Sequence, residues 1–542
     1  MRAVDWFDGQ LQRWEAFYTT AIHWAMDHRK TVLAVGFGSF ALAMGLMGML
    51  GSDFMPDYDR GDFQVGFKVE AGASLAAAKD KAKQLEDLIR TRPDGQPSPE
   101  IQHVYTTIGS GLNGSITEGA IYVKLTDGHR RGLIPIRREL RERLSHVAGV
   151  ETDVSAVSDF GDSKPIALAV MSPDRRLVEQ AEPIVLAALR GVDGAVDVSS
   201  SRDQGKPELR LAMDRRSASD LGVSPMAVAN LVRPLVDGVD VAKYEDPGTG
   251  EQYDVTVRLS DRDRSRAGQL ETMTVGSTKK DKFDQNLQVK LSSVARFEET
   301  TAPARLERRA LQAQILITAN KEGKTLQEVV NDANLKLAAL RRSGVLPDGV
   351  DVAFTGSAKD NKETAGYMGT AMLLAVAFIY FVLASQFESF KLPITIMLSL
   401  PLSMVGMVLM LLITGDAMSM MTSIGLILLM GLVTKNAILL VDRALQNIRE
   451  HGMTRREALI EAGTTRLRPI LMTSLAMIGG MLPLFLAIGA GAQMRAPMAR
   501  AVVGGLITST LLTLIVIPVF FDILDEFTWK KVWARIRTTR LP

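Results

Sequence analysis

Cysteine is absent from the 542 residues, and histidine occurs only six times. The first absence excludes disulfide frameworks, thiolate catalysis and cysteine-ligated zinc or iron–sulfur sites. No metal-ligand spacing joins the histidines, which are His23, His28, His103, His129, His146 and His451. An excess of one sign of charge is also missing, because 63 Lys and Arg face 61 Asp and Glu. That balance excludes a nucleic-acid-binding protein that works through a basic tail.

Long apolar runs, by contrast, are plentiful, although the mean hydropathy of the chain is only +0.09. A value near zero fits either a plain globular chain or a mixture of very apolar and very polar regions. Six windows, five of them without any charge, reach the length of about 20 residues that a helix needs to cross a bilayer. These windows are 31–51, 364–387, 392–414, 417–441, 470–493 and 501–521. We therefore predict a membrane protein with one span, a large polar insert and five further spans in quick succession.

Basic residues predict the orientation of these spans, because loops rich in Lys and Arg stay on the cytoplasmic side. They occur just before the first window, between the fourth and fifth windows, and in a tail at 524–542. Six spans put all three sets on one side of the membrane, so the insert is predicted to lie outside, which is the periplasm if the source is a Gram-negative bacterium. Residues 1–28 place Trp and Phe at helical spacing, which fits an amphipathic helix on the inner membrane surface or a helix packed on its own membrane domain.

The polar insert alternates short β-like runs with helical patterns. Its first part gives the order βαββαβ, which is that of a ferredoxin-like fold. The predicted strands there are 63–69, 101–108, 119–125 and 149–157, and the helices are 74–92 and 134–147. The order then repeats with strands at 165–171, 195–201, 208–213, 314–319 and 350–355 and helices at 175–189, 225–236 and 325–340. A long insertion with β-like runs at 252–259 and 287–294 interrupts this second unit.

Several runs carry a resemblance that extends over nearly the whole chain. They are LGSDFMPD at 50–57, AGASL at 71–75, LGVS at 221–224, YDVTV at 253–257, GLVTKNAIL at 431–439 and RLRPILMTS at 466–474. In this order they are similar to the second half of a resistance-nodulation-division (RND) efflux transporter, of the multidrug branch that exports hydrophobic and amphiphilic molecules. The resemblance implies two porter subdomains, at 52–163 and 164–362, with a docking hairpin inserted at about 237–304. It also implies a surface helix at 1–28, a first span at 29–51, a five-helix bundle at 363–523 and a basic cytoplasmic tail at 524–542.

A full-length RND transporter contains two such sets of spans and two exterior loops, related as a tandem repeat. The chain corresponds to one set, so it is either the product of a split gene or a truncated product. Its start at Met1, before the surface helix, favours a separate gene. The resemblance therefore implies a complementary N-terminal-half RND subunit as partner.

Lys435 is the one charge inside the apolar windows, where a buried ammonium costs several kcal/mol unless it is paired or hydrated. It either faces the bundle interior as a functional group or extends toward the cytoplasmic edge near Asp442. The resemblance favours the first, because Lys435 matches the lysine of the RND proton relay, and it also assigns Asn436, Thr473 and Arg466 to that relay. From the residues alone, Thr473 equally fits a hydroxyl bonded to its own helix, and Arg466 equally fits a cytoplasmic anchor.

A counter-charge for Lys435 is missing, because none of the apolar windows contains Asp or Glu. In RND transporters the acidic relay residues belong to a span of the first half, so a second polypeptide is expected to supply the proton-binding carboxylates. Ionised carboxylates attract Lys435, and protonation from outside weakens that pairing and lets the helices shift. The energy source is then the proton gradient, and no cofactor or metal is expected.

These observations predict a subunit of a proton-driven efflux pump, not an enzyme, in the bacterial inner membrane. The resemblance implies a trimeric assembly with a periplasmic adaptor protein and an outer-membrane channel, and no nucleic-acid partner. Two other interpretations stay open: a non-transporting membrane-anchored ligand-binding or assembly protein, and an inactive fragment of a split gene. A buried ammonium favours transport over ligand sensing. Methionines at helical spacing are predicted to be packing residues, not metal ligands; they are Met404, Met407, Met410, Met418, Met420 and Met421.

Overall fold

The structure is a computed structural model, and its described part falls into two compact units. The described residues are 2–56, 58–109, 115–126, 131–157, 164–202, 205–260, 262, 267–280, 283–302, 306–489 and 491–526. The larger unit comprises 1–68, 79–201 and 307–542, and the smaller comprises 69–78 and 202–306. Most of the predicted basic tail, at 524–542, lies outside the described residues.

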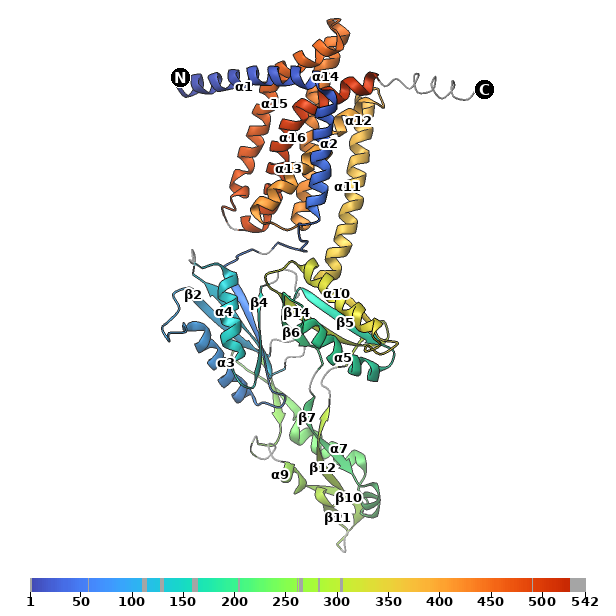
Figure 1. Cartoon of the computed structure of the whole chain (residues 1–542). Coiled ribbons are helices and arrows are strands. Elements are labelled where there is room, and N and C mark those ends of the chain that lie inside the picture. The colour runs from blue at the N-terminus through green and yellow to red at the C-terminus, as the bar shows by residue number, and fades with distance from the viewer. Residues whose placement is uncertain are drawn as a thin grey trace, which may run out of the picture. The chain divides into compact units, whose positions relative to one another are not determined.

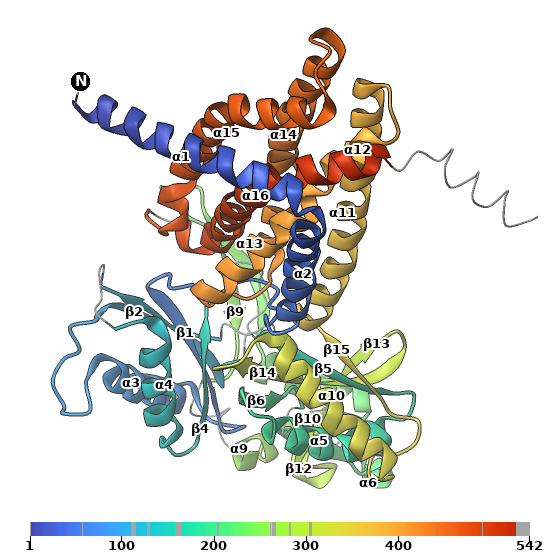
Figure 2. The same cartoon turned by 45° about the horizontal axis from the view of Figure 1, so that its top comes forward.

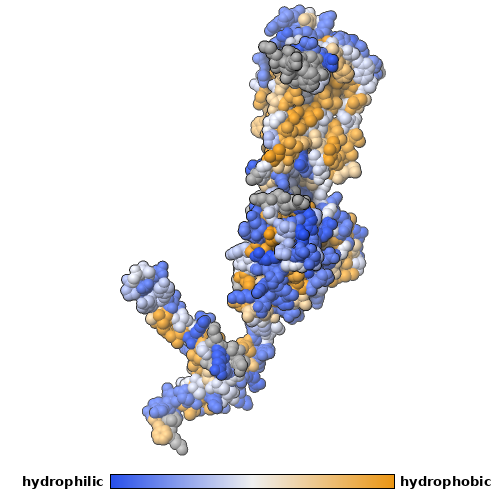
Figure 3. All heavy atoms as spheres, turned by 90° about the vertical axis from the view of Figure 1, so that its left-hand side faces the viewer, coloured by the Kyte–Doolittle hydropathy of each residue, from blue (hydrophilic) through white to orange (hydrophobic). Residues whose placement is uncertain are grey.

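The larger unit contains a bundle of long apolar helices, labelled in Figure 1. Within the described residues, six segments are long and apolar enough to cross a membrane. They are α2 (Arg29–Met47), α11 (Ser357–Phe387), α12 with α13 (Leu392–Met397 and Ser399–Thr414), α14 (Met420–Glu450), α15 (Arg455–Phe485) and α16 (Ala492–Glu526). Figure 3 shows apolar side chains gathered over this bundle, as expected of a surface that faces lipid.

Capping residues mark the starts of two of these helices, and that of α15 lies well before its apolar window. Ser419 and Thr422 form a capping box at the start of α14, and Thr454 and Glu457 form one at the start of α15. Helix α15 therefore begins before the window predicted at 470–493, and it also ends earlier, at Phe485. The window runs past that end because the turn at Gly489 and Gly491, both at positive φ, is as apolar as the helices on either side.

Small residues bring α13 and α16 into close contact at the centre of the bundle. A Cβ atom added to Gly406 on α13 would lie 2.1 Å from the carbonyl oxygen of Gly504 on α16, so only glycine fits at this crossing. Buried aliphatic side chains fill the space around it, including Met407, and Met404 and Met418 pack against the same cluster. Close backbone approach through small residues is a usual means of association for membrane helices.

Helix α1 (Arg2–Asp27) lies across one end of the bundle in both Figure 1 and Figure 2. Ile22 is fully buried against the bundle, and the Tyr18 hydroxyl donates to the Leu514 carbonyl of α16 at 2.9 Å. That carbonyl has no intrahelical partner to accept from, because Pro518, four residues on, carries no N–H. On the other face of α1, Trp14, Phe17 and Trp24 are more than half exposed; their exposed fractions are 52%, 76% and 52%. Packing on the bundle thus accounts for one face of α1, and the aromatic face remains available to the membrane surface.

The first α/β subdomain follows the βαββαβ order. Its strands are β1 (Asp62–Val69), β2 (Ile101–Ile108), β3 (Glu118–Leu125) and β4 (Val150–Ala156), and its helices are α3 (Leu75–Arg90) and α4 (Leu133–Ser145). The strands form one sheet in the order β2-β3-β1-β4, which leaves β4 at an edge. Apolar residues alternate along β1, where Phe63, Val65 and Phe67 are buried against the helices.

The second α/β subdomain repeats this order with a different set of elements. Its strands are β5 (Ile166–Ser172), β6 (Ala195–Ser200), β14 (Gln312–Lys321) and β15 (Asp351–Thr355), with the short β13 (Glu307–Arg309) added, and its helices are α5 (Arg175–Arg190) and α10 (Leu326–Arg342). β14 pairs with both β5 and β6, and β15 pairs with β5 on its other side. The nearly continuous apolar β5 lies in the middle of a core that both helices cover.

The smaller unit contains the long insertion and starts earlier in the chain than predicted. Its elements are β7 (Lys206–Met213), α6 (Arg215–Asp220), α7 (Pro225–Val236), β8 (Val239–Glu245), β9 (Gln252–Val257), α9 (Ala267–Glu271), β10 (Thr274–Lys280), β11 (Asn286–Lys290), η1 (Leu291–Ser293) and β12 (Ala295–Ala302). The strand at 208–213 and the helix at 225–236 were expected in the second βαββαβ unit, and that expectation is wrong. β7 pairs along its whole length with β12, and α7 packs in a separate core with them. β8 and β9 form a hairpin that is exposed throughout within this chain, while the wider division into domains stays a prediction.

Candidate functional site

The first candidate site lies on α14, where Lys435 stands among apolar residues of the bundle. Its side chain is half-buried, and its Nζ donates to the Sδ atom of Met477 on α15 at 3.3 Å. A thioether is a weak acceptor and carries no charge, so it does not neutralise an ammonium. Within the described residues, Lys435 forms no ion pair.

Three carboxylates near the ends of the bundle are paired with other cations, whereas Asp442 accepts from the Gln446 amide at 3.4 Å. Asp522 pairs with Arg29 at 2.8 Å. Asp416 pairs with Arg500 at 2.9 Å. Glu461 pairs more loosely with Arg443, at 3.4 Å. Within the described residues, Lys435 therefore lies in an apolar helix without an ion-pair partner.

Asn436, the next residue of α14, faces the interior instead. It is 2% exposed, and its Nδ2 lies 3.4 Å from both the Ser474 Oγ of α15 and the Thr510 Oγ1 of α16. Those two hydroxyls are 3.1 Å apart, and Thr510 also donates to the Leu506 carbonyl at 2.7 Å. The amide and two hydroxyls thus form a buried polar triad that joins three helices.

One atom of this triad, the Oδ1 of Asn436, can accept a further hydrogen bond. Among the described residues, the Oδ1 of Asn436 is buried without a hydrogen-bond partner. A buried amide oxygen without a partner costs free energy, so the site favours a donor such as a water molecule or a moving ammonium.

Thr473 and Arg466, the other predicted relay residues, lie on α15, and among the described residues neither forms a hydrogen bond with Lys435. The Thr473 hydroxyl donates to the Ile470 carbonyl of its own helix at 3.1 Å, which is the local alternative considered for it. Thr473 and Met477 are four residues apart and share a helix face, so Thr473 lies one turn from the group that contacts Lys435. Arg466 is half-buried two turns earlier, and its Nε has no hydrogen-bond partner among the described residues.

Sequence reasoning missed three members of this site: Met477, Ser474 and Thr510. Ser474 closes the quoted run at 466–474, and Thr510 belongs to a polar cluster within an otherwise apolar window. Polar residues inside an apolar span are a usable signal, because each needs a partner there. Which of them face one another depends on how the helices pack, since Asn436 and Thr510 are 74 positions apart in sequence.

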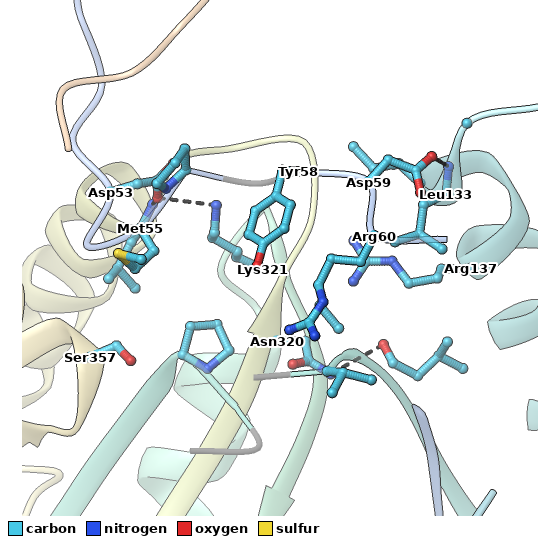
Figure 4. A pocket seen from close by; sticks show the side chains of 18 of the residues that line it. Asp53, Met55, Tyr58, Asp59, Arg60, Leu133, Arg137, Asn320, Lys321 and Ser357 are labelled. Atoms are coloured by element: carbon cyan, nitrogen blue, oxygen red, sulfur yellow. Dashed lines mark hydrogen bonds and ion pairs between the residues drawn. The ribbon is translucent and has the colours of Figure 1, made fainter. Parts of the chain in front are cut away.

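A second candidate site is a cavity of about 370 Å³ in the larger unit, drawn in Figure 4. The segment after α2 forms one wall, and α4, β4, β14 and the start of α10 form the others. Its lining mixes apolar side chains with cations and anions; the charged residues among the described ones are Asp53, Asp59, Arg60, Arg137, Arg141 and Lys321.

Two aspartates of that wall sit at the starts of helices. Asp53 is 5% exposed; its Oδ1 accepts from the Leu326 N–H of α10 at 2.7 Å and lies 3.1 Å from the Lys321 Nζ. Asp59 accepts from the Leu133 N–H of α4 at 3.1 Å. Each carboxylate meets the positive end of a helix dipole, which fixes the segment between them. Figure 4 shows Asp53 joined to Lys321 on one side of the cavity and Asp59 beside Leu133 on the other.

The same segment is tied to the helix that carries Lys435. The Met418 N–H donates to the Gly51 carbonyl at 2.8 Å, and the Gln327 N–H of α10 donates to the Ser52 carbonyl at 3.0 Å. Met418 directly precedes Ser419, the N-cap of α14. Backbone bonds therefore run from the start of α14, through residues 51–53, to the start of α10.

Known proteins resemble this chain over most of its length. A model described as the AcrB/AcrD/AcrF family matches residues 2–525. Relatives named multidrug resistance protein MdtC are 29% identical over 530 residues in Erwinia tasmaniensis and 30% identical over 517 residues in Citrobacter koseri. These alignments cover 96% and 93% of this chain but 49% and 48% of the relatives, so the chain spans about half the length of the curated relatives it matches. A solved structure described as a heavy metal efflux pump shares the fold, with a TM-score of 0.81 at 22% identity over 95% of this chain and 53% of that one.

Proposed function

We propose a transport function from the premise that this chain belongs to the AcrB/AcrD/AcrF family of resistance-nodulation-division (RND) transporters. It is accordingly an inner-membrane protein of the multidrug RND kind. Our proposal is that it contributes the cationic half of a proton-driven pump that exports amphiphilic or hydrophobic small molecules. Lys435, Asn436, Thr473 and Arg466 are its proposed relay residues.

The observation that carries this proposal is the uncompensated charge of Lys435 in the bundle. A half-buried ammonium beside a thioether is costly, and a carboxylate brought near it relieves that cost. Protonation of the carboxylate removes the attraction, so the position of α14 becomes coupled to proton binding. Asn436 offers a buried oxygen next along the helix, to which an ammonium or water can donate.

The relay carboxylates are supplied from outside these 542 residues, because none of the apolar windows contains Asp or Glu. They belong either to another part of a longer polypeptide or to a separate subunit, and the chemical requirement is the same in both cases. An assembly with one acid-bearing half and one half like this chain satisfies it. We extend the proposal to the family's general organisation, a trimer with a periplasmic adaptor and an outer-membrane channel.

The cavity in the exterior part suits an amphiphilic cargo. Apolar side chains such as Met55, Leu133 and Ile134 share its lining with Arg60 and Lys321. Such a lining removes apolar surface from water and keeps ionic partners in reach of a polar head, which fits a range of compounds. The backbone bonds from residues 51–53 to α14 offer a mechanical route between proton binding and this cavity.

The proposal is tested by replacing Lys435 in the full assembly, with the acid-bearing half present. We expect Lys435→Ala to abolish proton-dependent export of two amphiphilic dyes, cationic ethidium and neutral Nile red, measured by fluorescence in cells. Lys362→Ala is the matched control, because Lys362 is an exposed lysine at the start of α11. Unchanged export by a folded Lys435→Ala protein would disprove the relay assignment.

A further inference from the structure

The two α/β subdomains of the larger unit meet through a cluster of charged side chains. Arg141 on α4 belongs to the first subdomain, whereas Asp197 in β6 and Glu322, just after β14, belong to the second. The Nε of Arg141 lies 2.8 Å and 3.0 Å from the two carboxylate oxygens of Asp197, and its Nη1 pairs with Glu322. The side chains of Arg141 and Asp197 are only 19% and 5% exposed, so water screens this ion pair weakly.

An irregularity in β6 aims Asp197 across this boundary. Thr318 of β14 pairs with Ser199, and Asn320 pairs with Val196, so Asp197 and Val198 together face the single residue between them. This is a β-bulge, which turns a side chain out of the regular alternation. Asp197 has a φ of +52°, a left-handed conformation that aspartate tolerates better than most residues but that still costs free energy. The contacts of its carboxylate compensate for that cost.

Side chains of the second subdomain also complete the edge of the first subdomain's sheet. β4 is an edge strand, and the Val154 N–H donates to the Asp197 Oδ2 at 3.3 Å. The Nδ2 of Asn320 donates to the same oxygen at 3.0 Å and lies 3.4 Å from the Val154 carbonyl. Lys164, in the connection between the subdomains, donates from its Nζ to the Asp197 carbonyl at 2.9 Å. Asp197 is therefore the centre of the contact.

The two subdomains do not depend on this contact for their cores. The core of the second consists of its own residues, among them Ile166, Leu168 and Val329, with Phe54 from the segment after α2 packed on it. The first subdomain buries Phe63 and Leu85 separately. Subdomains that meet through charges rather than apolar surface can part without exposing a core, and relative motion is then the default expectation.

We propose that Arg141, Asp197 and Glu322 form a latch that holds the two subdomains together and that opens as a unit. Arg141, Val154 and Asn320 also line the cavity of about 370 Å³, so opening the latch moves one of its walls. Removing the charge of Asp197 or of Arg141 breaks the buried ion pair between them, although Glu322 keeps a pair with Arg138 or Arg141, and this loss shifts the equilibrium toward the open arrangement. The latch is a property of the fold and does not depend on the proposed transport.

The absence of native cysteine permits a direct distance measurement on the full chain. Ser145→Cys on α4 and Gln180→Cys on α5 place spin labels at exposed positions, one on each subdomain. Double electron–electron resonance of the chain in lipid nanodiscs then reports the distance between them. Asp197→Asn keeps the size and the left-handed tolerance of the residue but removes its charge, and Arg141→Gln removes the opposite charge.

We expect both variants to increase the longer-distance population at least about tenfold. Asp193→Asn is the matched control, because Asp193 lies four residues from Asp197 and its pair with Lys324 stays within one subdomain, with an 88% exposed side chain. The control is expected to give the parent distribution. Parent-like distributions for Asp197→Asn or for Arg141→Gln, in protein that elutes as folded, would overturn the latch. If Asp197→Asn does not fold, the distance distribution of Arg141→Gln alone tests the latch.

Discussion

The backbone N–H of Asp53 donates to the carbonyl of Met418 at 2.8 Å, although 365 positions separate the two residues in sequence. Asp53 follows the first apolar helix, and Met418 precedes the cap of the helix that carries Lys435. With the Ser52–Met418 bridge beside it, this bond joins two segments of chain between the helix bundle and the α/β subdomains of the larger unit. The carboxylate of Asp53 then reaches α10 and Lys321 from the same point.

Asp53→Asn is expected to destabilise the protein by about 2–4 kcal/mol, because it removes one partner from a buried ion pair. The melting temperature in detergent, followed by circular dichroism, measures the effect. Asp332→Asn serves as control, since the side chain of Asp332 is 43% exposed in its pair with Lys324 and exposed pairs contribute little. Equal melting temperatures for the two variants would show that Asp53 does not fasten this junction.

Thr510→Val tests the buried triad of Asn436, Ser474 and Thr510. The substitution keeps the shape but removes a hydroxyl that bonds to two other helices, so we expect a loss of about 0.5–1.5 kcal/mol. Thr513→Val is its control, because the buried Thr513 hydroxyl bonds to the Ser509 carbonyl of its own helix. Thermal melting of both variants in detergent is the measurement, and a larger loss for Thr513→Val would contradict the role given to the triad.

Tyr18→Phe removes the hydroxyl that donates to the Leu514 carbonyl. We expect a loss of about 1–3 kcal/mol, because the carbonyl left by Pro518 then has no donor in a buried position. Tyr367→Phe, at a 70% exposed tyrosine of α11, should leave the melting temperature unchanged. If Tyr18→Phe has the same melting temperature as the parent protein, then water or lipid replaces the hydrogen bond of the Tyr18 hydroxyl without loss of stability.

Asp153→Asn gives a pH-dependent prediction in the first α/β subdomain. Burial raises the pKa of the Asp153 carboxyl, and Lys164, with its Nζ 4.0 Å away, only partly opposes this rise. A raised pKa means that the folded state binds the proton more tightly than the unfolded state, so this stabilisation is present at acid pH and is lost as pH rises through the folded pKa. The variant should therefore melt above the parent near neutral pH, and the difference should shrink below the ordinary aspartate pKa of about 3.9. Melting curves from pH 3.5 to 8 measure it, and a difference that grows toward acid would refute the assignment.

Local patterns predicted most of the helices and strands of the polar insert between α2 and α11. The strand at 101–108 was placed with its observed bounds, because alternation and turn residues are local properties. The partner of β7 was not predictable in this way, since its register with β12 joins residues 206–213 to 295–302. An alternating strand has the same pattern whichever sheet it enters, so the insertion was placed too late in the chain.

The same distinction, between residues with a local sequence signal and residues placed only by tertiary packing, holds for the candidate site. Lys435 and Asn436 stand out because a charge and an amide are rare inside an apolar helix. Met477 has no such signal, and only the packing of α14 against α15 brings it to Lys435. No sequence pattern identified Asp197, because its role depends on a β-bulge and a left-handed backbone conformation rather than on its neighbours in sequence.

The bond from Tyr18 to Leu514 joins α1 to α16, across 496 positions of sequence. During synthesis α1 is made long before Leu514, so this hydrogen bond forms only after much of α16 exists. One end of the bundle thus stays incomplete until α16 is in place. Helix α1 therefore completes its contacts late in assembly, although it precedes the other bundle helices of this chain in sequence.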